Sequence, residues 1–217
     1  SSDLYPLWVT DRGAMGGVVP LAESDLGLGP PRWQGTLLVA DLAATCAQVA
    51  AAGGAIRNGP VEVPQVGQLA LMSDPAGAMS SLLQPLAPMA RRDPLVVGEV
   101  AWSELITPDP EAALQFYGQL FGWVQHDSFD AGPAGLYRLW GPDSQSLRGL
   151  MRAPAGMAPA WRHYLHVADL DTAIAKAVAA GGRVTAGPAP VPSGDRMAHL
   201  VDPQGVAFAL YGRQPRP

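Results

Sequence analysis

A carboxylate inside an apolar run is the clearest candidate for chemistry in this chain. Glu104 lies in WSELIT, residues 102–107, and burial of a carboxylate costs several kcal/mol unless it is hydrogen-bonded or paired. We interpret Glu104 as either an acid that faces a cavity or the partner of an arginine such as Arg162 or Arg152. The sequence has no Ser-His-Asp order, phosphate-binding loop or zinc-finger spacing, which argues against those kinds of site.

The composition limits the classes of partner. Charged residues make up 15% of the 217 residues and the net charge is −5, so we expect no nucleic-acid partner, because such a partner requires a cationic surface. No apolar run approaches the roughly 18 residues of a membrane helix, and no charged-then-apolar leader opens the sequence. A single cysteine is consistent with a reducing compartment, so we expect no membrane partner and a cytoplasmic location.

An internal repeat predicts the elements that position Glu104. Residues 33–83 align with residues 161–211 without a gap, so that LVADL lies on HVADL, AAGG on AAGG and DPAG on DPQG. Each copy predicts a strand, a helix capped by an aspartate and ended by Gly-Gly, and further strands, the last two joined by an Asp-Pro-x-Gly turn. The predicted unit is β-α-β-β-β.

A weaker similarity extends this pattern to the N-terminus. Residues 1–28 resemble the back half of a unit that begins near Val97 and in which Asp109 caps a helix that ends at Gly122. The sequence therefore predicts an α+β fold of four modules. The first module lacks its opening strand and helix in the sequence given.

The chain resembles the vicinal oxygen chelate superfamily, which includes glyoxalase I, bleomycin-resistance proteins and extradiol dioxygenases. The resemblance lies in ELITPDPEAALQFYGQLFGW, HYLHVADLDTAIAKAVAAGGRV and LVDPQGVAFAL. Members of this superfamily pair two modules into an incompletely closed, eight-stranded barrel around a cavity. The resemblance implies two such barrels, a first domain at residues 1–88 and a second at residues 97–217, separated by a linker at residues 89–96.

The resemblance also implies a divalent metal, such as zinc, iron, nickel or manganese, held by His, Glu or Gln of the first and last strands of each module. The first-strand position of the third module falls on Trp102, seven residues before the capping Asp109. That of the fourth module falls on His163, six residues before the capping Asp169. The last-strand positions fall on Ala209 and within residues 148–152. Of these residues only His163 can bind a cation, so we expect no bound metal or other cofactor.

The favoured interpretation is a protein that binds a small hydrophobic or aromatic molecule in a barrel cavity without a catalytic metal, as resistance proteins of this superfamily sequester drugs. The side chains expected to contact the ligand are Trp102, Tyr137, Trp140, Met151, Ala207 and Ala209. The aromatic residues among them could instead fill the barrel.

An enzyme is the alternative interpretation. It would be a lyase, isomerase or dioxygenase-like member of the same superfamily, with Glu104 and His163 as an acid/base pair or as metal ligands. His166 and His199 align with leucines of the other copy and are expected to be core histidines, and Cys46 a small buried hydrophobe. The partner implied is a small molecule, and the protein is expected to be a monomer or a homodimer.

Overall fold

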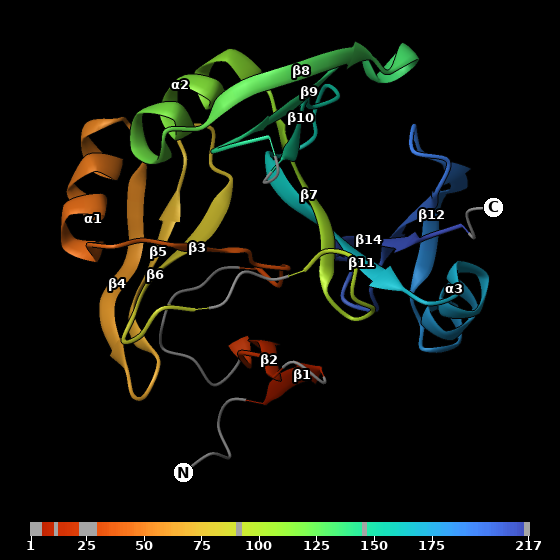
Figure 1. Ribbon diagram of the computed structural model, residues 1–217, viewed down its shortest axis with the longest axis horizontal. Helices are drawn as coiled ribbons and strands as arrows, with labels where there is room; N and C mark the ends of the chain where they lie inside the picture. The colour runs from red at the N-terminus through yellow and green to blue at the C-terminus, as the bar shows by residue number, and fades with distance from the viewer. Residues whose placement is uncertain (1–5, 11–12, 22–29, 90–92, 145–146, 215–217) are drawn as a thin grey trace. The chain divides into compact units, whose positions relative to one another are not determined.

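The computed structural model describes residues 6–10, 13–21, 30–89, 93–144 and 147–214 (Figure 1). Contacts divide the chain into a first unit, residues 1–33, 91–101 and 163–217, and a second unit, residues 34–90 and 102–162. Part of the predicted linker, residues 90–92, lies outside the described residues. The predicted domains at 1–88 and 97–217, and their pairing of modules into barrels, stay predictions.

The second unit contains the second module, which has one helix and four strands. These elements are β3 (Thr36–Leu38), α1 (Leu42–Ala51), β4 (Ala55–Val63), β5 (Gly67–Ser73) and β6 (Met79–Pro85). The strand order is β3-β6-β5-β4, with β3 parallel to β6 and the other neighbours antiparallel. The last strand of the module thus lies beside its first strand.

The third module has the same order of elements and lies in the second unit from Trp102 onward. Its elements are β7 (Val100–Thr107), α2 (Pro110–Phe121), β8 (Val124–Asp130), the 3-10 turn η3 (Gly132–Ala134), β9 (Leu136–Gly141) and β10 (Arg148–Arg152). The strand order is β7-β10-β9-β8, again with the first and last strands parallel.

The first unit contains an N-terminal hairpin and most of the fourth module. The elements are β1 (Leu7–Thr10), β2 (Gly13–Gly17), β11 (Ala160–Val167), α3 (Leu170–Ala179), β12 (Arg183–Pro190), β13 (Arg196–Val201) and β14 (Ala207–Gly212). The fourth module has the order β11-β14-β13-β12. The hairpin falls where the back half of a first module is predicted, and the rest of that region, residues 1–5, 11–12 and 22–29, lies outside the described residues.

Each helix begins at the aspartate that the sequence predicts. Asp41 accepts a hydrogen bond from the backbone N–H of Ala44, and Asp169 accepts one from Thr172. Asp109 accepts from two N–H groups, which are otherwise without partners in the first turn of α2. Gly122 ends α2 with a φ of 66°, a conformation that glycine adopts without strain. The predicted α+β fold class is confirmed.

An aromatic cluster forms the core of the second unit. Tyr117 of α2 is fully buried, and its ring contacts those of Phe116, Trp123, Trp140 and Trp161. Side chains of α1 and of the second module's sheet belong to the same core. In the first unit, a separate apolar core lies between α3 and the sheet of β11–β14. Within the described ranges, no helix is both long and apolar enough to span a membrane.

Candidate functional site

One face of the third module's sheet is free of helix α2 and carries the candidate site. Successive side chains of a strand point to opposite faces of its sheet. Leu105 belongs to the aromatic core on the α2 side, so Glu104 lies on the other face. Arg138 binds Glu111 of α2, so its neighbour Tyr137 shares the face of Glu104.

Four side chains on this face form the Glu104 cluster, which comprises Trp102, Glu104, Tyr137 and Arg162. Glu104 is only 3% exposed, and its two carboxylate oxygens accept hydrogen bonds from the Tyr137 hydroxyl at 2.9 Å and from Arg162 Nη1 at 2.9 Å. The Tyr137 oxygen in turn accepts from Trp102 Nε1 at 2.9 Å. The buried carboxylate is therefore neutralised by a guanidinium and fixed by a phenol. Of the two alternatives for Glu104, a cavity acid or the partner of an arginine such as Arg162 or Arg152, the structure shows the pair with Arg162.

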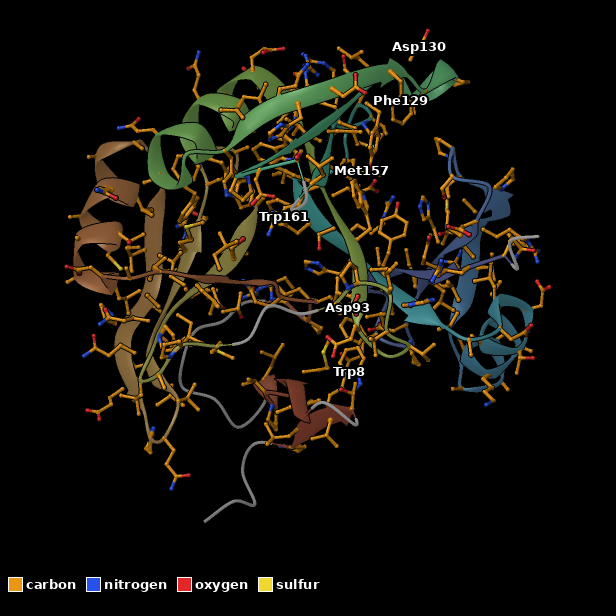
Figure 2. The ribbon with its side chains drawn as sticks, viewed as in Figure 1. Trp8, Asp93, Phe129, Asp130, Met157 and Trp161 are labelled. Carbon is orange, nitrogen blue, oxygen red and sulfur yellow. The ribbon has the colours of Figure 1, made fainter. Side chains whose placement is uncertain are left out.

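Three rings on the same face form an aromatic row. Phe129 of β8 lies directly opposite Tyr137 of β9, with ring centroids 5.2 Å apart, and Tyr137 continues to Trp102 through their hydrogen bond. Phe129 is 38% exposed and lies near the end of β8 (Figure 2). Trp102 and Tyr137 are half-buried. Because the polar atoms of Trp102 and Tyr137 are hydrogen-bonded within the protein, the faces of these rings suit stacking against an apolar, planar molecule.

Met151 and Trp140, both predicted to contact the ligand, lie on opposite faces of the third module's sheet. Met151 lies two residues from Gly149 on β10 and is half-buried on the face of the Glu104 cluster. Trp140 does not lie on this face. It is fully buried on the α2 side against Trp123 and Trp161, and its Nε1 donates to the carbonyl of Gly149 at 3.0 Å. The prediction that Trp140 contacts a ligand is wrong, and Trp140 is a core residue.

The position assigned to His163 also requires correction. Trp102 lies seven residues before the capping Asp109, and the residue seven positions before the capping Asp169 is Arg162. Arg162 also makes the contact with Glu104, and His163, the next residue on β11, points to the opposite face of that strand. Arg162 therefore takes the place that the sequence comparison gave to His163.

The last-strand positions follow from strand register. In the third module, Glu104 lies five residues before the capping Asp109 and is paired with Gly149 of the last strand. In the fourth module, Tyr164 lies five residues before the capping Asp169 and is paired with Ala209 of the last strand. Gly149 thus supplies the position that the sequence placed only within residues 148–152. Ser81 holds the same position opposite Thr36 in the second module.

The residues at the four metal positions do not fit a metal ion. They are Trp102, Gly149, Arg162 and Ala209, and none of their side chains offers an electron pair to a cation. Within the part of the chain that the structure describes, no three His, Cys, Asp or Glu side chains are grouped as a metal ion would require. We therefore derive no chemistry through a metal.

The first unit shows a related arrangement around Ala209. Tyr164 and His199 are the neighbours of Ala209 on the two flanking strands, and the Tyr164 hydroxyl lies 3.0 Å from His199 Nε2. The fully buried methyl group of Ala209 leaves room for this contact above it. Ala207, the other small residue expected to face a ligand, is exposed at the start of β14. Neither the Tyr164–His199 contact nor Phe129 was expected from the sequence.

The histidine and cysteine predicted to be buried differ in their surroundings. His166 is 4% exposed and packs against the Tyr211 ring, but its Nδ1 has no hydrogen-bond partner among the residues that the structure describes. Burial raises the pKa of the Cys46 thiol, which disfavours the nucleophilic thiolate. Cys46 packs against the core of the second unit as a small hydrophobe.

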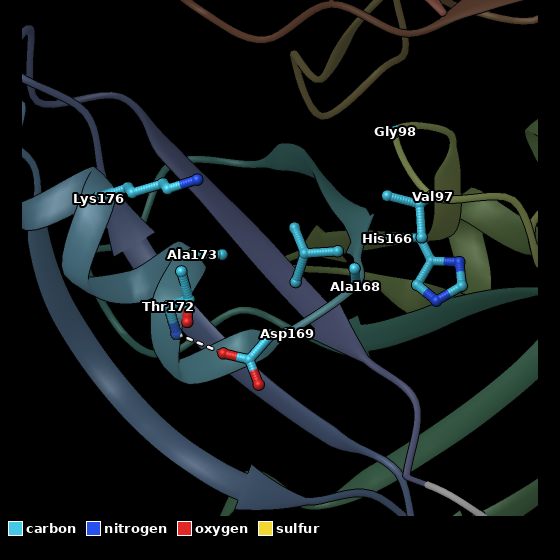
Figure 3. A pocket seen from close by; sticks show the side chains of 9 residues that line it. Val97, Gly98, His166, Ala168, Asp169, Thr172, Ala173 and Lys176 are labelled. Carbon is cyan, nitrogen blue, oxygen red and sulfur yellow. Dashed lines mark hydrogen bonds between the residues drawn. The ribbon is translucent and has the colours of Figure 1, made fainter. Parts of the chain in front are cut away.

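A pocket of about 330 Å³ lies in the first unit between the 97–98 turn and the start of α3 (Figure 3). The cap hydrogen bond from Thr172 to Asp169 and the stem of Lys176 border it. None of the residues predicted to bind ligand lines this pocket. We assign the candidate site to the Glu104 cluster, where the polar contacts converge.

A second buried carboxylate, Asp74, links the turn of the second module to the aromatic core. It accepts hydrogen bonds from the backbone N–H groups of Gly77 and Ala78 at 2.8 Å each and from the Tyr117 hydroxyl at 3.4 Å. Burial raises the pKa of Asp74 above its usual value, although these hydrogen bonds oppose the shift. Asp74 is therefore a source of pH-dependent stability.

We expect the stability advantage of wild type over Asp74→Asn to grow as the pH falls. A carboxyl group whose pKa is raised by folding binds its proton more tightly in the folded state, so its contribution to stability is lost as pH rises through the folded pKa and is full below the unfolded pKa. Urea unfolding across a pH series measures this difference. Asp202→Asn is the control, because Asp202 caps the equivalent turn but is only half-buried. A difference that is flat with pH would contradict the prediction.

A family model matches residues 98–210, and its description is Glyoxalase/Bleomycin resistance protein/Dioxygenase superfamily. The "Putative glyoxylase CFP32" of Mycobacterium tuberculosis is 30% identical over 214 residues, which cover 98% of this chain and 82% of that protein. The anthracycline biosynthesis protein DnrV of Streptomyces peucetius is 30% identical over 183 residues, which cover 83% of this chain and 66% of that protein.

Solved structures share the fold at lower identity. The 2,2',3-trihydroxybiphenyl 1,2-dioxygenase of Sphingomonas wittichii has a TM-score of 0.61 and 16% identity over 96% of this chain and 81% of that chain. The Mn(II)-bound glyoxalase of Novosphingobium aromaticivorans has a TM-score of 0.59 and 17% identity over 82% of this chain and 61% of that chain. At this identity the similarity concerns the fold alone.

Proposed function

The chain belongs to the glyoxalase, bleomycin-resistance and dioxygenase superfamily, and from this premise we propose that it binds a small planar aromatic or hydrophobic molecule without a catalytic metal. The binding surface is the aromatic row of Phe129, Tyr137 and Trp102. One observation carries the proposal: the positions at which this fold would hold a metal have no ligating side chains, while an aromatic row is built beside them.

The charges of the cluster favour an uncharged ligand. Arg162 is paired with Glu104 at 2.9 Å, and the side chains are 16% and 3% exposed. A guanidinium that is already neutralised gives little free energy to an anionic ligand, because binding would have to replace a pair that is largely removed from water. Stacking and burial of apolar area then supply most of the affinity.

Titration with the aglycone of an anthracycline tests the proposal, because two relatives are named for anthracycline biosynthesis. Loss of tryptophan fluorescence should report saturable binding. Trp102→Leu should weaken the affinity by about tenfold or more, which corresponds to the free energy of one stacking contact. Trp8→Leu is the matched control, since Trp8 is half-buried in the N-terminal hairpin. Equal affinities of the two variants would contradict the assignment, as would no binding of this probe, of a naphthol or of a flavone.

Elemental analysis of protein purified without chelator tests the absence of a metal. We expect zinc, iron, nickel and manganese each at far below one equivalent per chain. A stoichiometric amount of any of them would overturn the metal-free proposal.

The enzyme alternative requires Glu104 and His163 to act on one substrate. Glu104 accepts from Tyr137 and Arg162, and His163 points to the face of β11 opposite to Arg162. These contacts favour Glu104 as the anchor of a binding surface rather than as an acid/base group. No further observation favours a lyase, isomerase or dioxygenase-like reaction over binding.

A further inference from the structure

We propose that Gly149 determines the specificity of this site, so that it accepts a flat aromatic molecule and excludes a metal ion. This inference rests on the proposed function. Gly149 lies on β10, the strand between β7 and β9, at the position where the fold would place a last-strand metal ligand. Its lack of a side chain lets Tyr137 of β9 pass over β10 to reach Glu104 and Trp102 of β7.

The space above Gly149 is already filled. A Cβ atom at position 149 would lie 1.9 Å from the Tyr137 hydroxyl oxygen, 2.5 Å from Tyr137 Cζ and 2.9 Å from Glu104 Cβ. These distances are far below van der Waals contact. A metal-binding side chain at position 149 and the Tyr137 bridge to Glu104 therefore exclude each other.

Backbone conformation does not explain the glycine. Many glycines of the chain have a positive φ, but Gly149 is not among them, so an L side chain meets no backbone strain there. The equivalent positions of the second and fourth modules carry Ser81 and Ala209. In the third module the Tyr137 ring crosses the last strand so closely that no Cβ fits beneath it, and this ring therefore accounts for the glycine.

The small residue in the fourth module supports the same principle independently. Tyr164 and His199 meet across Ala209 at 3.0 Å, as Glu104 and Tyr137 meet across Gly149. In the third and fourth modules, side chains of the two flanking strands thus occupy the place where a last-strand metal ligand would lie. Tyr137 of the third module approaches the last strand so closely that a Cβ at position 149 would overlap its hydroxyl, and only glycine leaves enough space for it.

Gly149 also keeps the aromatic row continuous. If Tyr137 were displaced, Trp102 Nε1 would lose its acceptor and Glu104 would lose one of its two donors. Phe129 would then pack against a ring in a different position. A single methyl group at position 149 should thus disrupt the whole binding surface.

A double-mutant cycle with Gly149→Ala and Tyr137→Val tests the inference. Gly149→Ala alone should raise the unfolding equilibrium constant by about tenfold or more, as expected for one overpacked methyl group, and should weaken anthracycline-aglycone binding by a similar factor. In the Tyr137→Val background the same change should have a much smaller effect on unfolding, because the overlap with Tyr137 is gone and only the 2.9 Å approach to Glu104 Cβ remains. Gly16→Ala is the matched control, because Gly16 is also a strand glycine and a Cβ there would meet no atom within 4 Å.

The cycle separates this inference from the proposed function. Equal effects of Gly149→Ala in the two backgrounds would overturn the role of Gly149, whether or not an aromatic probe binds. If Gly149→Ala does not fold, a double variant that folds and is only slightly less stable than Tyr137→Val alone supports the role, and a double variant that does not fold either overturns it. If the cycle behaves as expected but wild type binds no aromatic probe, the steric role stands while the proposed ligand class and function fail.

Discussion

Replacement of Arg162 by methionine is expected to lower the free energy of unfolding by about 3 kcal/mol, because it leaves the buried charge of Glu104 without its cation. The Glu104 side chain is 3% exposed and that of Arg162 16%, so water cannot take over the role of the guanidinium. The Tyr137 hydroxyl would remain as a donor but carries no charge. Urea unfolding monitored by circular dichroism measures the loss.

Arg196→Met is the control for this prediction. Arg196 makes a hydrogen-bonded pair with Asp171 at 2.9 Å, but the two side chains are 33% and 65% exposed. Solvent-exposed pairs contribute little to stability, so we expect a much smaller change. Replacing Glu104 and Arg162 together by leucine and methionine should recover much of the loss, because no unpaired charge remains. Equal losses in Arg162→Met and Arg196→Met would show that Glu104 is not held by this ion pair.

The fold was predictable because its signals are local and repeated. Asp41, Asp109 and Asp169 are N-caps in the structure, as the sequence predicts, since a short acidic side chain satisfies the first N–H groups of a helix in any context. Gly122 ends α2 for a similarly local reason. The residues 22–29 and 90–92, which include parts of the predicted first module and linker, lie outside the described residues, and the predicted domains remain untested.

The site was predicted only in part, because strand residues change face at every step. Arg162 and His163 are adjacent, so an alignment shifted by one residue assigns the position to the candidate base His163 instead of to Arg162, the cation paired with Glu104. The signal that distinguishes them was present, since Arg162 and Trp102 are equally distant from their capping aspartates. A pair with an arginine such as Arg162 or Arg152 was one of the two alternatives for Glu104, because a carboxylate within an apolar strand requires a partner unless it faces a cavity.

Other features could not be read from one sequence. Gly149 resembles any strand glycine until the path of Tyr137 is known, and that path depends on which strand lies between β7 and β9. Phe129 and Tyr137 are paired only by the register of a hairpin. Trp140 was assigned to the wrong face because an aromatic residue suits a ligand surface and a core equally well.

Trp140→Leu should provide the clearest separation of core from site. We expect it to lower the free energy of unfolding by about 3 kcal/mol, because it empties part of a fully buried aromatic cluster. Trp140 packs against Tyr117, Trp123 and Trp161, with centroid distances of 5.2, 5.0 and 6.2 Å. The change also removes the hydrogen bond from Nε1 to the Gly149 carbonyl.

The affinity for the anthracycline aglycone should distinguish Trp140→Leu from Trp102→Leu. Trp140 points to the α2 side of the sheet, so folded Trp140→Leu protein should bind the probe within about twofold of wild type, because it keeps the Glu104 cluster and the aromatic row on the opposite face. Trp102→Leu should lose affinity with a smaller loss of stability, because Trp102 is half-buried at the edge of the row. Both quantities can be measured on the same samples, by urea unfolding and by fluorescence titration. A Trp140→Leu variant that is stable but does not bind would move the site to the helix side of the sheet.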